Sequence, residues 1–166
     1  MTSKKAVAFD CGEYMDFTGY VNFHGTEGYA RDASFDLCVA WDGSPVISWH
    51  NGVWQGGTMS VVWWEDGVFE NGLFLKSTWA GGTWLDGTFR NSSWMTGRFE
   101  NGLFESSSWD RGVFAGGVFK NSTWYRGEWA GGRWEESSYM GEDGRIHGVN
   151  HTRWKRHCMG ISSITN

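Results

Sequence analysis

Proline, cysteine and long apolar runs are all scarce in this sequence of 166 residues. There is a single proline, and no apolar stretch approaches the roughly 18 residues that a membrane-spanning helix needs. The opening residues, MTSKKAVAFDCGEYM, include two lysines but no apolar run long enough for a signal peptide. We therefore expect no membrane partner, and a protein that stays inside a cell or in a particle assembled there.

The three cysteines, Cys11, Cys38 and Cys158, are odd in number and widely spaced. A disulfide framework in a small secreted domain usually has an even number of cysteines. The sequence therefore predicts no disulfide framework and favours a reducing compartment. The net charge of −5 is modest for this length, so it favours solubility and indicates no particular partner.

Catalytic motifs are missing as well. The sequence has no Gly-x-Ser-x-Gly, no phosphate-binding Gly-Lys-Ser/Thr loop and no dinucleotide fingerprint after a strand. The histidines lie outside the regular repeats, and nothing in the sequence proposes a catalytic pair of a histidine and a nucleophile. The spacing of His147, His151, His157 and Cys158 matches no standard zinc pattern. We therefore predict a protein that is not an enzyme and that has no cofactor and no metal site.

Glycine and tryptophan, by contrast, are abundant, with 25 and 13 residues. The stretch GVFENGLFLKSTWAG, residues 67–81, shows their arrangement, with an aromatic at every fifth position and a small residue two places before it. This step of five continues without a slip from Trp64 to Tyr139. The small residue is glycine or serine throughout, except at Val62. The dipeptides between these triplets, such as EN, LD, RN and KN, are mostly turn formers.

A period of five does not fit an α-helix, and a glycine and an aromatic in every repeat would form helices poorly. In an extended triplet the first and third residues point to the same side. The small residue and the aromatic therefore face one interior, and the middle residue faces out. We expect short strands that turn a corner every five residues, with rings filling the inside and a small residue making room for each ring.

A second period of fifteen is superimposed on the first. The small residues run Gly, Gly, Ser, as in Gly67, Gly72 and Ser77, and then repeat. The aromatics form matching classes, one of which is Trp49, Trp64, Trp79, Trp94, Trp109, Trp124 and Tyr139. If one coil corresponds to this period, like residues stack about 4.8 Å apart in columns. We favour this three-sided coil; the alternative is a four-sided coil with a period of twenty.

Over residues 47–141 this pattern resembles the pentapeptide-repeat family, whose members form a right-handed β-helix with a bulky residue at the centre of each pentad. The family favours alanine at the small position and leucine or phenylalanine at the centre, so Gly/Ser with Trp/Phe is a departure. The glycine- and tryptophan-rich variant resembles repeats in uncharacterised proteins of tailed bacteriophages. GRFENGLF also looks like part of a MORN repeat, and its NG is a hairpin signal. An antiparallel β-meander is therefore the alternative fold.

The two ends of the chain break the pattern. Residues 1–46 carry seven acidic and three basic residues and are expected to form an N-terminal cap or a docking segment. Residues 142–166 form a basic C-terminal tail or cap. Basic residues interleaved with an aromatic can hold phosphate and stack a base. The candidate binding residues are Arg145, Arg153, Trp154, Lys155 and Arg156, although nucleic acid is not the partner that we expect.

We expect a non-enzymatic structural or interaction protein, a rigid scaffold for protein contacts. The phage resemblance implies a virion component or accessory, located in the virion or the host cytoplasm, whose partners are other virion or scaffold proteins or further copies of itself. The pentapeptide-repeat resemblance implies the alternative, a DNA mimic that inhibits an enzyme such as gyrase. A mimic needs a strongly acidic surface, whereas residues 52–141 hold ten acidic and seven basic residues. A row of outward hydroxyls could also suit ice binding: Thr78, Ser93, Ser108, Thr123 and Ser138.

Overall fold

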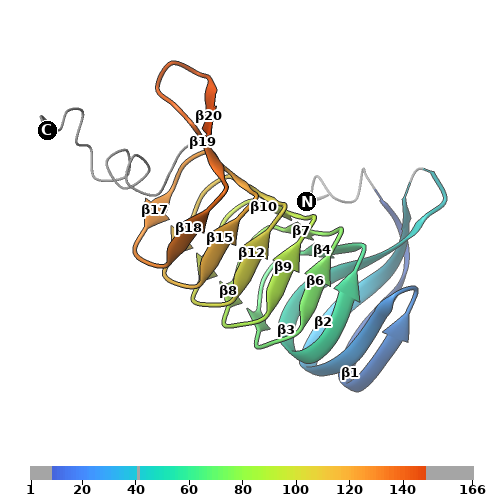
Figure 1. Ribbon diagram of the computed structural model, residues 1–166. Coiled ribbons are helices and arrows are strands. Elements are labelled where there is room, and N and C mark those ends of the chain that lie inside the picture. Colours follow the sequence, from blue (N-terminus) through green and yellow to red (C-terminus); the bar gives the residue numbers. More distant parts are fainter. Residues whose placement is uncertain (1–8, 41, 149–166) are drawn as a thin grey trace, which may run out of the picture.

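The computed structural model describes the backbone of residues 9–40 and 42–148 and, within these ranges, the side chains from residue 14 onward. Every regular element in these ranges is a β-strand. Figure 1 shows a stack of coils that runs from the blue end, at β1, to the orange end, at β19 and β20. The prediction of an all-β solenoid is confirmed.

Three long strands come first: β1 (Phe9–Phe23), β2 (Thr26–Ala40) and β3 (Pro45–Ser60). Short strands of two or three residues follow and form three faces. The first face contains β4 (Val62–Trp64), β7 (Thr78–Trp79), β10 (Ser93–Trp94), β13 (Ser108–Trp109), β16 (Thr123–Trp124) and β19 (Ser138–Met140). The second face contains β5 (Val68–Phe69), β8 (Thr83–Trp84), β11 (Arg98–Phe99), β14 (Val113–Phe114) and β17 (Glu128–Trp129). The third face contains β6 (Leu73–Leu75), β9 (Thr88–Arg90), β12 (Leu103–Glu105), β15 (Val118–Lys120) and β18 (Arg133–Glu135), and β20 (Ile146–Gly148) ends the described chain.

The register of these strands fixes the length of the coil. Each short strand of a face pairs in parallel with the next strand of that face, so that Trp79 lies opposite Trp94 and Trp94 opposite Trp109. The other two faces follow the same step, as in Phe99 opposite Phe114. One coil therefore consists of three five-residue units, one on each side, as predicted. This register excludes the four-sided coil and the antiparallel meander for the repeat.

The aromatic rings form the core as stacked columns. Under the first face the column comprises Trp49, Trp64, Trp79, Trp94, Trp109 and Trp124, with successive centroids 4.7–5.0 Å apart and ring planes within 9° of parallel. Rings from neighbouring faces meet edge to face, as Trp94 and Phe99 do at 5.8 Å and 77°. Both geometries are favourable for aromatic pairs and add about 0.5–1.5 kcal/mol per pair beyond the burial of area.

The glycines lie at two of the three corners, and their role differs from the prediction. Gly97 has a φ of +122°, and a Cβ added there would lie 2.5 Å from the carbonyl oxygen of Gly82 in the previous coil. Glycine is needed because the backbone takes a conformation that L-residues avoid and passes close to another backbone. The expected reason, room for the ring of the same triplet, was therefore wrong.

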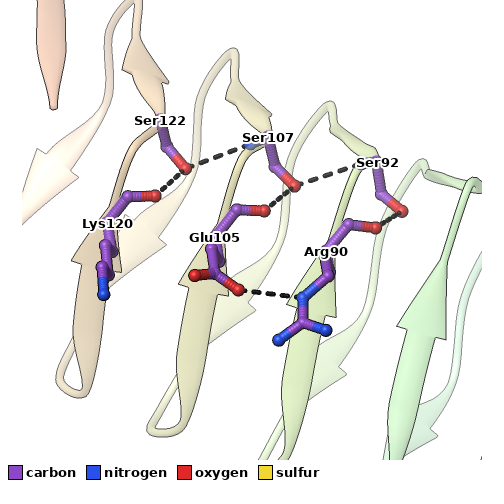
Figure 2. A network of polar contacts seen from close by, with 6 residues as sticks. All are labelled: Arg90, Ser92, Glu105, Ser107, Lys120 and Ser122. Carbon is purple, nitrogen blue, oxygen red and sulfur yellow. Dashed lines mark hydrogen bonds and ion pairs between the residues drawn. The ribbon is translucent and has the colours of Figure 1, made fainter.

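Serine replaces glycine at the third corner, where its hydroxyl is used. The hydroxyl of Ser107 donates to the carbonyl oxygen of Glu105 at 2.7 Å and accepts from the backbone N–H of Ser92 at 3.1 Å. Figure 2 shows this contact repeated from coil to coil as a serine ladder. The residue before each serine has a positive φ, for example +48° at Asn91. The ladder thus satisfies backbone groups at a corner where the chain turns sharply.

The N-terminal cap has the same cross-section as the repeat. Strand β2 runs antiparallel to β3 around the first coil, and β1 runs antiparallel to β2. Inside, Phe35 stacks on Trp49 with centroids 5.8 Å apart. Elsewhere the inward residue is small: a Cβ on Gly28 would lie 2.4 Å from the ring of Trp54. The first coil is therefore closed by antiparallel strands that the five-residue pattern does not reveal.

One cysteine corrects a prediction. Cys38, a buried residue of β2, is disulfide-bonded. The residue opposite it in the β1–β2 register is Cys11. A disulfide was not expected, because the wide spacing of the cysteines hides the hairpin that places residues 11 and 38 side by side. The disulfide at Cys38 adds a covalent link to the cap.

Candidate interaction surfaces

The outward row of the first face carries hydroxyl groups. It comprises Thr78, Ser93, Ser108, Thr123 and Ser138, as the spacing predicted. The side-chain hydroxyl oxygens of Ser93 and Ser108 lie 3.4 Å apart, and so do those of Thr123 and Ser138. Shallow hollows run beside this row along the serine ladder. The face can offer hydrogen bonds to a ligand but carries no cluster of charge.

The third face carries charges of alternating sign. Arg90, Glu105, Lys120 and Glu135 lie opposite one another in successive coils. Nε of Arg90 lies 2.8 Å from a carboxylate oxygen of Glu105, as Figure 2 shows. Exposed pairs of this kind stabilise a protein by less than about 1 kcal/mol each. Their main consequence is that this row does not form a surface of one sign.

The cap exposes a group of aromatic side chains. Of the eight large hydrophobic residues that are exposed in the described chain, four lie on β1 and β2: Tyr14, Tyr20, Tyr29 and Val39. The rings of Tyr20 and Tyr29 meet edge to face at 5.2 Å. The hydroxyl of Tyr20 donates a hydrogen bond to Glu27, which raises the pKa of Tyr20 to about 12. Tyrosines beside carboxylates form an amphipathic surface of the kind that is enriched in protein interfaces.

A histidine cluster ties this cap to the first coils. Nε2 of His50 lies 2.8 Å from a carboxylate oxygen of Asp36 in β2. Nδ1 of the same ring lies 2.9 Å from a carboxylate oxygen of Glu65, the residue that follows β4. The ring of Tyr14 stacks on His50 at 6.2 Å. An imidazole held on both sides by carboxylates is fixed in orientation. The geometry suits a structural tie across β3.

The open end of the solenoid lies at β1. Among the described residues β1 pairs along one edge only, with β2. A hollow of about 200 Å³ ends the core there, and its walls include Met15, Phe17, Val21 and Phe23. Figure 1 shows β1 as the outermost strand of the stack. The molecule thus presents a strand edge beside partly covered apolar side chains.

The predicted basic site is only partly described. Arg145 is exposed in the hairpin between β19 and β20, and its backbone N–H donates to Asp143 at 3.0 Å. In the same hairpin Nε2 of His147 lies 3.0 Å from that carboxylate, and this hydrogen bond lowers the pKa of Asp143. The remaining candidates, Arg153, Trp154, Lys155 and Arg156, lie outside the described residues. The candidate binding role of these residues therefore stays an untested hypothesis.

Sequence reasoning missed the histidine cluster and the tyrosines of the cap. One signal was present: Glu65 stands one full coil after His50 in the sequence. Nothing indicated Asp36, because the period stops before the cap. In the two described ranges no group of three or more His, Cys, Asp or Glu is placed to hold a metal ion.

The stacked coils, with their columns of like residues, show a repeat β-solenoid. No helix within residues 9–40 and 42–148 is long and apolar enough to cross a membrane. No model of a protein family, no curated protein and no solved structure matches the chain.

Proposed function

We propose that this chain is a non-enzymatic interaction protein, a rigid scaffold that presents its N-terminal cap to a protein partner. The observation that carries the proposal is the concentration of exposed tyrosines on β1 and β2, with Tyr14 64 %, Tyr20 45 % and Tyr29 58 % exposed. The rings of Tyr20 and Tyr29 are in contact, with centroids 5.2 Å apart, and exposed aromatics that gather in this way are characteristic of protein-binding sites. The acidic residues around them favour a partner with a basic or hydrogen-bonding surface.

The body of the solenoid supports the scaffold role through its regular interior. The rings of Trp79, Phe99 and Phe104 are fully buried, and the coils are joined by backbone hydrogen bonds on all three faces. Such a body keeps its shape while the outward residues change from coil to coil. On the second face, for example, the outward row reads Val68, Thr83, Arg98, Val113 and Glu128. A fixed frame with a variable surface is suited to protein contacts.

The proposed setting is a phage particle, as a virion component or an accessory to its assembly. This part of the proposal is supported by the resemblance of the glycine- and tryptophan-rich repeat to repeats of tailed-phage proteins, and it is an argument by analogy. Membership of the pentapeptide-repeat family is proposed on the same basis, from the five-residue step and the inward bulky residue. The three-sided coil suggests a divergent member.

The alternative function, a DNA mimic, receives less support from the geometry. Such a protein needs closely spaced carboxylates along one face, whereas the third face alternates in sign from Arg90 to Glu135. The second face mixes aliphatic residues with Arg98 and Glu128. The cap is the most acidic region, but its carboxylates are interspersed with tyrosines. We therefore favour protein contacts through the cap.

Cross-linking and affinity purification from the native particle or cell test the proposal. We expect a defined protein partner whose cross-links fall on the cap. Tyr29→Ala should weaken its retention at least tenfold, while Tyr125→Ala, an exposed tyrosine of the solenoid body, should leave retention unchanged. Both variants should melt with the parent. Equal retention by both variants, or substrate turnover by the purified chain, would contradict the proposed function.

A further inference from the structure

The unpaired edge of β1 is a surface that needs an explanation. Within the described residues this strand, residues 9–23, has a hydrogen-bonding partner on one side only. Inside the coil, Met15, Phe17 and Phe23 are only partly covered and line the hollow that ends the core. An open strand edge beside apolar side chains templates pairing with another strand, and proteins either use such an edge or block it.

We propose that a second copy of the chain covers this edge, so that two solenoids join end to end through their β1 strands. A twofold axis perpendicular to the stack makes the two β1 strands antiparallel. The cap already contains this arrangement, because β1 pairs antiparallel with β2 and β2 with β3, each over one coil of the same cross-section. A second β1 continues the same stacking by one more step.

The corner of β1 selects the register inside the coil. The chain turns at Thr18 and Gly19, where the pairing with β2 shifts and the φ of Gly19 is +141°. With Thr18 on the twofold axis, this corner meets its own copy and the triangular outlines coincide. Phe17 then faces Gly19 of the second copy, and Met15 faces Val21. A large side chain of one copy thus lies opposite a smaller residue of the other, and the hollow at the end of each core is covered by the other copy.

The outward residues agree with this register. From Tyr14 to Asn22 the even-numbered side chains of β1 are exposed. With Thr18 on the axis, Asp16 faces Tyr20 of the second copy and Tyr14 faces Asn22, so that no two carboxylates meet. A shift that places Asp16 on the axis would set this carboxylate against its own copy, and like charges directly opposite are unfavourable.

The opposite end of the stack is a poorer match for this edge. Strand β20 pairs antiparallel with β19 and occupies the edge of the first face there. A head-to-tail contact would therefore meet the hairpin rather than a bare coil on that face. It would also be heterologous and would extend into a filament instead of closing as a dimer. The geometry favours the closed, twofold contact at β1.

Charge substitution on the exposed side of β1 tests the proposal in the full-length protein. We expect the parent to sediment with the mass of two chains. Tyr20→Glu places a carboxylate opposite Asp16 twice in each dimer and should weaken association at least a hundredfold, giving single chains at micromolar concentration. Adding Asp16→Lys should restore the dimer, because the new lysine faces the new glutamate of the other copy. Tyr125→Glu, on an exposed tyrosine far from β1, should leave the dimer intact.

The rescue separates this contact from a local effect on the cap. Within one chain residues 16 and 20 lie on either side of the corner at Thr18 and Gly19, on two different faces, so Asp16→Lys would not offset damage confined to one copy. A parent that stays a single chain at high micromolar concentration would overturn the proposal. So would a dimer that persists in Tyr20→Glu, or a double variant that stays monomeric. If the parent is a single chain whose edge amides in residues 14–22 resist hydrogen exchange, another segment covers the edge. These outcomes leave the proposed function untouched, because its test rests on Tyr29.

Discussion

Replacing Gly97 with alanine should lower the free energy of unfolding by about 2–6 kcal/mol, because two costs add at this corner. The φ of Gly97 is +122°, a conformation that costs a residue with a side chain roughly 1–3 kcal/mol. The new Cβ would also lie 2.5 Å from the carbonyl oxygen of Gly82 and 3.1 Å from Nε1 of Trp79. One of these atoms is backbone and the other belongs to a stacked column. Overpacking therefore adds about 1–3 kcal/mol.

Two other glycines separate these costs. Gly43 has a φ of +85° with nothing within 4 Å of an added Cβ, so Gly43→Ala carries the conformational cost alone. Gly56 has neither a positive φ nor a neighbour within 4 Å, so Gly56→Ala should change stability by less than about 0.5 kcal/mol. Urea unfolding followed by tryptophan fluorescence would rank the three variants. Equal stability of Gly97→Ala and Gly56→Ala would refute the explanation of the corner.

Three further predictions concern single side chains. Ser107→Ala should lower the free energy of unfolding by about 1–3 kcal/mol, because it removes an acceptor and a donor of the serine ladder. Substitution of the neighbouring outward residue, Ser108→Ala, should lower it by less than about 0.5 kcal/mol. Equal melting temperatures for the two variants would count against the ladder. Arg98→Ala, at an exposed position of the second face, should change stability by less than about 0.5 kcal/mol, and a large fall in melting temperature would mean that the triplet faces are reversed. The hydrogen bond from His147 lowers the pKa of Asp143. The stabilisation that this bond gives the folded hairpin is therefore complete above the ordinary pKa of aspartate and is lost as the pH falls through the lowered pKa of Asp143. Amides of the β19–β20 hairpin should then lose protection, relative to the intrinsic exchange rate at each pH, below about pH 4, and protection that stays constant down to about pH 2 would contradict this.

The coil could be predicted from the sequence because every coil repeats the same pattern of small and aromatic residues. The spacing of Trp79 and Trp94 by one full period was enough to place one ring on the other, and both lie in the column as expected. The physical role of the small residues could not be read in the same way. Spacing predicted that Gly97 faces the interior beside Phe99, but it does not show that the backbone at Gly97 has a positive φ or that the carbonyl oxygen of Gly82 lies 2.5 Å from the missing Cβ.

A cap or docking segment was expected at residues 1–46, but its strands could not be predicted, because they follow the cross-section of the coil without the five-residue sequence pattern. Ala30 and Ala33 are inward residues there, and Gly28 lies against the ring of Trp54. No repeated aromatic marks such a strand, and antiparallel pairing relates residues whose separation changes along the chain. The contact of His50 with Asp36 was invisible for this reason. The acidic character of the region was the only signal for a docking surface.

Deletion of whole coils tests the central claim, the three-sided coil built from three five-residue units, most directly. Removing residues 97–111 takes out one coil and rejoins Thr96 to Gly112, which has the same corner conformation as Gly97, with a φ of +113°. Each coil contacts mainly its neighbours, so this variant should unfold cooperatively and keep its near-ultraviolet circular dichroism. Removing residues 97–116 instead shifts every later triplet to another face and stacks the tryptophan column on phenylalanines. The account predicts that the shorter deletion, 97–111, stays folded and that the longer one, 97–116, is disrupted, and the reverse order would contradict it.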